Sequence, residues 1–144
     1  MPKWLKVVLA LFAVLLVLCA VSAFAAKWWF DHNKDRLKSL GDTAAKDGAT
    51  WAMTHDADGC VDEALHRYDV EGGIVAEAGH TIFMRACLDK AQRPQGFCDA
   101  VPPRNELIKT AEWSVAKCRA LGRQGDQACT RMVKAIQESC AKKP

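Results

Sequence analysis

Cysteines constrain this chain more than any other feature of its sequence. Six of its seven cysteines lie after residue 26, namely Cys60, Cys87, Cys98, Cys118, Cys129 and Cys140. An even set of cysteines downstream of an export-type apolar segment is typical of a disulfide framework formed in an oxidising compartment. The sequence therefore predicts a small disulfide-stapled domain outside the cytoplasm.

A long apolar run precedes this domain. Residues 7–26 carry no charge, and as a helix they would span about 30 Å, the thickness of a bilayer core. Trp4 lies just before the run, and Trp28 and Trp29 lie just after it. Tryptophan is enriched at both membrane interfaces. We therefore expect residues 7–26 to form a single transmembrane anchor, with Trp4, Trp28 and Trp29 at the two interfaces.

A cleaved signal peptide is the alternative to this anchor. Residues 23–25, Ala-Phe-Ala, have the small-x-small pattern of a cleavage site. Cleavage there would leave Trp28 and Trp29 near a free terminus, where nothing in the sequence would bury them. For that reason the anchor is the preferred interpretation. Cys19 is expected to serve as a small apolar residue within the span.

The charges beside the apolar run disagree with the cysteines about topology. Basic residues follow the run more often than they precede it: Lys27, Lys34, Arg36 and Lys38 against Lys3 and Lys6. The positive-inside rule would then place the C-terminal domain in the cytoplasm. We give the cysteines more weight. The expected location is the cell inner membrane, single-pass, with the C-terminal domain in the periplasm or extracellular space.

The residues after the run show helical periodicity, with turns at Gly72-Gly73 and between Gly122 and Gly125. We predict an all-α fold: an N-terminal membrane helix followed by a small disulfide-stapled domain of about five helices, arranged as two helical hairpins. The expected organisation is a transmembrane anchor or signal segment over 1–30, a stalk helix or linker over 31–57, and the stapled domain over 58–144.

Each expected helix has an apolar stripe that should face a common core. The last two stripes are Leu107, Ile108, Ala111, Val115 and Cys118, and then Cys129, Met132, Val133, Ile136 and Cys140. Asp58 and Asp126 are the expected N-caps of the first and last helices of the domain. Gly48, on one face of the expected stalk, either permits close packing or weakens that helix.

Hairpin geometry predicts the disulfide pairing. Two antiparallel helices bring together residues that are equidistant from the turn. Cys60 and Cys87 are centred on Gly73, and Cys118 and Cys129 are centred on residues 123–124. The remaining pair is Cys98–Cys140, because a hairpin that folds at residue 123 places Cys140 near the start of the preceding helix, within reach of Cys98.

Motifs for catalysis, cofactors and metals are missing from the sequence. The closest cysteine spacing is eleven residues, so no Cys-x-x-Cys redox pair occurs. His55, Cys60 and His66 would be candidate zinc ligands only if the domain were cytosolic and reduced, and their spacing is loose. Residues 54–65 resemble a calcium loop but lack its first and last acidic ligands. We therefore predict no enzyme activity, no cofactor and no metal.

Charge gives little indication of a partner. After the apolar run the chain contains 18 basic and 17 acidic residues, and the two signs are mixed along the sequence. This pattern argues against a nucleic-acid-binding surface. The sequence favours a membrane-anchored protein with a protein partner in the cell envelope, in an accessory, inhibitor or immunity-type role. The alternatives are a zinc or thiol protein, if the domain is cytosolic, and a module that binds a small apolar ligand. Candidate lining residues for such a ligand are Trp51, Phe83, Phe97 and Trp113.

Overall fold

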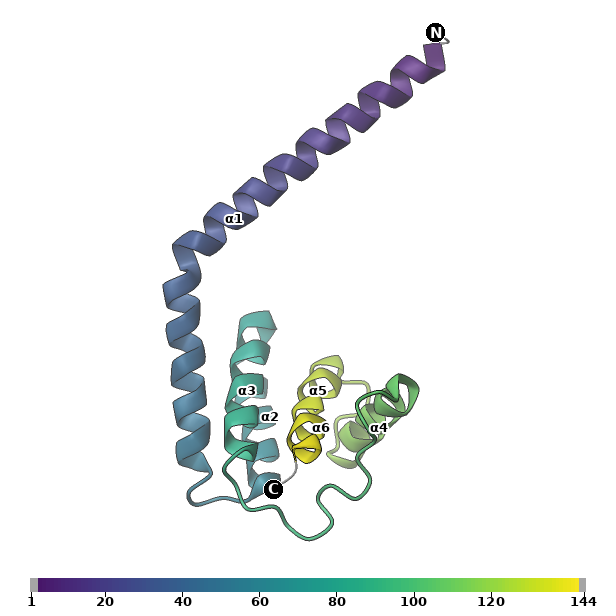
Figure 1. The fold of residues 1–144 in the computed structure, drawn as a ribbon. Helices are drawn as coiled ribbons and strands as arrows, with labels where there is room; N and C mark the ends of the chain where they lie inside the picture. Colours follow the sequence, from purple (N-terminus) through teal and green to yellow (C-terminus); the bar gives the residue numbers. More distant parts are fainter. Residues whose placement is uncertain (1–2, 143–144) are drawn as a thin grey trace. The chain divides into compact units, whose positions relative to one another are not determined.

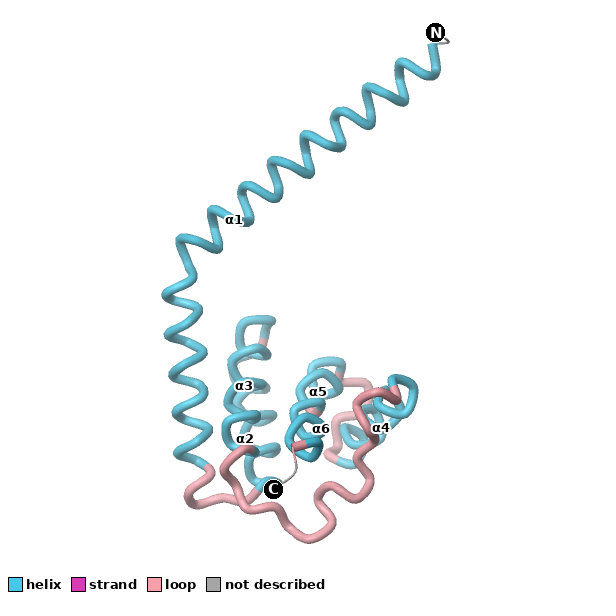
Figure 2. Tube along the Cα trace, in the orientation of Figure 1, coloured by secondary structure: helices cyan, strands magenta, loops and turns pink. Residues whose placement is uncertain are grey.

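The structure is a computed structural model that describes residues 3–142, and all regular structure in that range is helical (Figures 1 and 2). The helices are α1 (Lys3–Trp51), α2 (Ala57–Glu71), α3 (Gly73–Leu88), α4 (Leu107–Ala120), α5 (Gln127–Met132) and α6 (Lys134–Ala141). Val133 alone separates α5 from α6. The predicted all-α class is confirmed, and the apolar run and the predicted stalk form one continuous helix.

The chain divides into two compact units, Met1–Ser39 and Leu40–Pro144. The first contains the apolar run. Among the described residues, α1 is the one helix long and apolar enough to cross a membrane, and none of its apolar stretch is buried. This is the property expected of a membrane anchor or of a signal segment. Trp4, Trp28 and Trp29 are all exposed on this helix.

The C-terminal unit (Leu40–Pro144) has its core between the α2–α3 hairpin and α5–α6. Helices α2 and α3 pack along each other, α5 and α6 pack on α3, and α4 packs on α5. The fully buried large side chains include Val61, Phe83, Leu88, Met132 and Ile136. The last predicted stripe therefore does form part of the core: Cys129, Met132, Val133 and Ile136 are buried, and Cys140 is partly buried against them.

The last turns of α1 belong to this unit because Gly48 lets two backbones approach closely. A Cβ atom at Gly48 would overlap the carbonyl oxygen of Phe83 and lie 3.1 Å from the amide nitrogen of Cys87. Close packing is thus the reason for this glycine. Ala44 and Trp51, on the same side of α1, pack against the core.

Three disulfides join the pairs that the hairpin geometry predicts. Cys60 is bonded to Cys87, Cys98 to Cys140 and Cys118 to Cys129, with Cα atoms 5.7, 5.6 and 6.0 Å apart. Each closes a loop that would otherwise add entropy to the unfolded chain, and each contributes about 3–4 kcal/mol in that model. Disulfides of this kind indicate a domain outside the reducing cytosol.

The caps of two helices were assigned from sequence, and one assignment was wrong. Asp126 caps α5 as predicted, since its Oδ1 accepts a hydrogen bond of 3.0 Å from the Cys129 amide. At α2 the cap is Asp56 instead of Asp58: Asp56 Oδ1 accepts from the Gly59 amide at 2.9 Å. Asp58 lies in the first helical turn, where its negative charge still favours the helix N-terminus.

Candidate interaction surface

Helix α4 presents to the core a different face from the one predicted. Its buried residues are Thr110, Ser114 and Cys118, which recur at intervals of four. The disulfide to Cys129 fixes Cys118 inward, and the helical period brings Ser114 and Thr110 to the same side. The prediction that Leu107, Ile108, Ala111 and Val115 face the core was therefore wrong, and only Cys118 of that stripe is buried.

Hydrogen bonds satisfy the polar side of α4 that points inward. Gln137 Nε2 donates to Thr110 Oγ1 and to the Pro102 carbonyl, both at 2.8 Å. Ser114 Oγ donates to the Thr110 carbonyl at 2.8 Å. Buried polar groups that keep their hydrogen bonds avoid the full cost of desolvation. The polar face of α4 can therefore be buried while its apolar side chains stay outside.

Four side chains form the exposed apolar face of α4, called here the α4 face: Leu107, Ile108, Ala111 and Val115. Leu107 is 78% exposed, Ile108 77% and Val115 48%. Ala111 and Val115 each follow a buried residue, Thr110 or Ser114, by one position, which is about 100° around the helix. Leu107 is the first residue of α4 and is exposed at the end of the helix. Exposed aliphatic side chains that gather on one helix are a candidate surface for a partner.

A small open cleft of about 210 Å³ adjoins the C-terminal end of the α4 face. Val115 forms part of its wall, and Asp126, Gln127 and Thr130 supply polar groups. An apolar centre with polar groups at its rim is the usual composition of a protein–protein interface.

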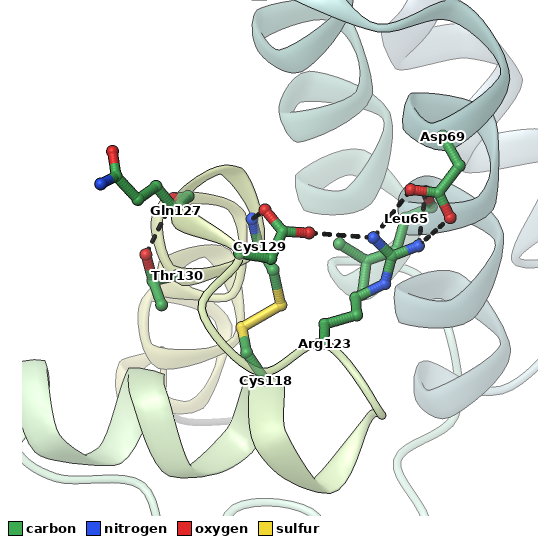
Figure 3. Close-up of polar contacts among 8 residues, drawn as sticks. Leu65, Asp69, Cys118, Arg123, Gln127, Cys129 and Thr130 are labelled. Atoms are coloured by element: carbon green, nitrogen blue, oxygen red, sulfur yellow. Dashed lines mark hydrogen bonds and ion pairs between the residues drawn. A yellow bond between two sulfur atoms is a disulfide. The ribbon is translucent and has the colours of Figure 1, made fainter.

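Arg123, in the turn between α4 and α5, connects this region to the first hairpin (Figure 3). Its guanidinium donates to Asp69 of α2, to Asp126 Oδ2 at 3.0 Å and to the Leu65 carbonyl at 3.1 Å. These bonds cross from the second hairpin to α2 and hold the turn beside the Cys118–Cys129 disulfide. Arg123 thereby helps to set the orientation of α4.

The acidic residues that pair with arginine in this region have lowered pKa values. Partial burial favours the neutral form of Asp126, but hydrogen bonds from the Cys129 amide and Arg123 outweigh it, so the pKa of Asp126 lies below its ordinary value. A second ion pair also links the hairpins: Arg131 of α5 holds Glu77 of α3 at 2.6 and 2.7 Å. Hydrogen bonds from Arg131 lower the pKa of Glu77.

A second exposed apolar surface lies at the turn of the α2–α3 hairpin. This hairpin tip consists of Val70, Ile74 and Val75 around Gly72-Gly73, with exposures of 74, 86 and 68% for the three side chains. Both glycines have positive φ, 65° and 86°, which lets the chain reverse between the two helices. The sequence predicted the turn. It did not predict that the aliphatic side chains on both sides of the turn would be exposed to solvent.

The aromatic residues proposed to line a ligand cavity do not converge on one site. Phe83 lines an open cleft of about 280 Å³ and has its ring 6.5 Å from that of Trp51. Phe97 and Trp113 line a different open cleft of about 320 Å³. Neither of these two clefts is lined by all four aromatic residues.

Two of the three residues considered as zinc ligands, Cys60 and His55, have other contacts. Cys60 is bonded to Cys87, and a disulfide sulfur is not a zinc ligand. The His55 ring stacks on Trp51 with centroids 4.0 Å apart. Within residues 3–142 no cluster of three or more potential ligands was found.

Two parts of the candidate surface were missed in the sequence. The apolar face of α4 was assigned to the core, and Arg123 was noted only as part of a turn. The sequence did contain a signal for Arg123, because this arginine lies in a turn between Gly122 and Gly125 and three residues before the capping residue Asp126. Comparison of the chain with protein-family models, curated proteins and solved structures gave no match.

Proposed function

We propose that this chain is a membrane-anchored protein of the cell envelope whose disulfide-stapled domain binds another protein in the periplasm or extracellular space. The α4 face is the docking surface. We assign the protein an accessory or inhibitory role without catalytic activity. The anchor is the apolar run of α1 within the inner membrane, and the oxidised cysteines favour the non-cytoplasmic side.

The single observation that carries this proposal is the orientation of α4. A helix with both a polar and an apolar side would normally bury the apolar side. Here a disulfide and a buried Gln137–Thr110 hydrogen bond keep the polar side inward. The apolar residues are consequently held in solvent on a rigid helix, which keeps the entropy cost of binding a partner low.

Photo-crosslinking in cells tests this proposal. A photoreactive amino acid at Ile108 should give a discrete crosslinked band in the envelope fraction. Leu107→Ser in the same chain should reduce the yield of that band severalfold. The matched control places the photoreactive residue at Met53, which is also exposed but lies outside the α4 face. Bands of equal intensity from both positions, unaffected by Leu107→Ser, would exclude the α4 face as a specific docking surface.

The small-ligand alternative has less support. Three of its four candidate aromatic residues, Phe83, Phe97 and Trp113, line two separate open clefts, whereas bound small molecules are usually enclosed on most sides.

A further inference from the structure

We propose that the Cys98–Cys140 disulfide is a site of thiol–disulfide exchange with dithiol reductants, whereas the other two disulfides are permanent parts of the core. The inference concerns the reactivity of one bridge within the C-terminal unit. It uses neither the anchor nor the α4 face of the proposed function, so its test can fail while that function stands.

Burial separates this bridge from the other two. Cys98 and Cys140 are both partly exposed. The cysteines of the other two bridges are 0–1% exposed: Cys60, Cys87, Cys118 and Cys129. Exchange begins when a thiolate attacks a disulfide sulfur, so its rate depends on access to that sulfur. A reductant therefore reaches Cys98–Cys140 in the folded protein, whereas the core must open before the other bridges can react.

The bridge also lies in a surface cleft of about 170 Å³, whose wall includes both Cys98 and Cys140. Cys118 borders a cleft as well, the one beside the α4 face. However, Cys118 is 1% exposed, and its partner Cys129 is not exposed at all. Cys98–Cys140 therefore combines an open approach with the exposure of both of its cysteines.

The two segments that this bridge joins can separate without opening the core. Cys98 lies in the non-helical connector between α3 and α4, residues 89–106, and Cys140 lies in the last turn of α6. The buried bridges hold α2 to α3 and α4 to α5. Gln137 still donates a hydrogen bond of 2.8 Å to the Pro102 carbonyl, near the entry to α4. Because local opening costs less free energy than global unfolding, reduction should free the connector around Cys98 and leave the helices packed.

The exchange is a balanced two-electron reaction. A thiolate of the dithiol attacks Sγ of Cys98 or Cys140, the S–S bond breaks, and the released cysteine leaves as a thiolate that takes up a proton. The second thiol of the reductant loses its proton, attacks the mixed disulfide and releases the other cysteine. The bridge thereby gains two electrons and two protons, and the dithiol is oxidised to a disulfide. The reverse reaction restores the bridge.

Reduction of the folded chain with dithiothreitol, followed by alkylation and peptide mass mapping, tests the inference. The full chain is held in detergent micelles, and Cys19, the free cysteine, is blocked first. We expect a first intermediate labelled at Cys98 and Cys140 alone, formed about tenfold faster or more than any other reduced species. Reduction of all three bridges in one phase would overturn the inference, as would a first intermediate labelled at either of the other bridges.

A chain with Cys98→Ser and Cys140→Ser is the matched control. It should lose the fast phase and keep the slow reduction of the two buried bridges. If those bridges became as reactive in this variant as Cys98–Cys140 is in the unmodified chain, the core would depend on the third bridge. That result would overturn the claim that the exchange is local.

A second arm distinguishes the two sources of dithiol. A thioredoxin-type protein whose resolving cysteine is replaced by serine forms a mixed disulfide that cannot be released by its own second thiol. A complex trapped on Cys98 or Cys140 would identify a protein dithiol as the reductant. Fast reduction by dithiothreitol without such a complex would identify small dithiols, and a complex trapped on a cysteine of the buried bridges would overturn the inference.

Discussion

Gly48 shows how one residue can decide whether a helix joins a core. The backbone of α1 approaches the Phe83 carbonyl so closely that a side chain at residue 48 has no room. Gly79 of α3 is also within a helix, but a Cβ atom there would meet nothing within 4 Å. The two glycines therefore have opposite effects on stability, although the sequence alone does not distinguish them.

Substitution by alanine should separate these two glycines. We expect Gly48→Ala to reduce the free energy of unfolding by about 1–3 kcal/mol, because the backbones must move apart. Gly79→Ala should raise it by up to about 1 kcal/mol, through the lower entropy of the unfolded chain and higher helix propensity. Urea unfolding of the two variants measures both values. A stable Gly48→Ala variant would mean that α1 does not pack on α3 at this point.

Arg123 is the residue that most directly fixes one hairpin against the other. Its guanidinium has polar partners in both hairpins, and its side chain is only 18% exposed. Arg123→Ala should cost about 1–3 kcal/mol, as expected for charged hydrogen bonds that leave partners unsatisfied. The matched control Arg119→Ala, on the exposed surface of α4, should change stability by less than about 0.5 kcal/mol. Thermal unfolding of the two variants compares them, and equal losses would contradict this role of Arg123.

Acid should weaken the contacts between the hairpins. The pKa values of Asp126 and Glu77 are lower in the folded protein than their ordinary values. The stability that they contribute is therefore present above the unfolded pKa of about 4 and is lost as the pH falls through the folded pKa. Unfolding free energies between about pH 5 and pH 2 should decline less steeply for Asp126→Asn than for the unmodified protein. Identical pH dependences would exclude this carboxylate as a contributor.

At the scale of elements, α4 is the helix for which the predicted buried face differs from the buried face in the structure. If Ile108 is exposed, Ile108→Ser should change the unfolding free energy by less than about 0.5 kcal/mol. Had it packed in the core, the loss would resemble that of Ile136→Ala, about 2–5 kcal/mol. Chemical denaturation of both variants therefore tests the orientation directly. A cost for Ile108→Ser equal to that for Ile136→Ala would mean that α4 is turned the other way.

The sequence predicted the hairpins and two of the disulfide pairs because these depend on local spacing, and the third pair, Cys98–Cys140, then remained. Distances from a glycine turn place Cys60 beside Cys87 and Cys118 beside Cys129, whatever else surrounds them. The orientation of α4 depends instead on contacts far apart in the chain, such as Gln137 with Thr110. The apolar and buried stripes of α4 are also neighbours around the helix, with Cys118 at the edge of both. Periodicity alone does not choose between two stripes that lie so close together.

At the scale of the whole molecule, an apolar helix, which we propose to be an anchor, precedes a disulfide-stapled unit that exposes two aliphatic surfaces. Three disulfides are central to it, because a domain of this size has a limited core and its buried residues lie mostly between the two hairpins. One of them, Cys118–Cys129, also helps to keep the α4 face exposed. Oxidation and membrane retention must therefore occur together if the proposed function holds.

The most direct test is the intact mass of the protein recovered from cell membranes and alkylated under denaturing conditions without reductant. We predict a chain that retains its apolar run and carries a single alkyl group, on Cys19, with the other six of its seven cysteines unreactive. A mass that lacks the apolar run would show cleavage and remove the anchor. Seven alkyl groups on a chain that keeps the run would contradict the central claim, because the domain would then be reduced and cytoplasmic.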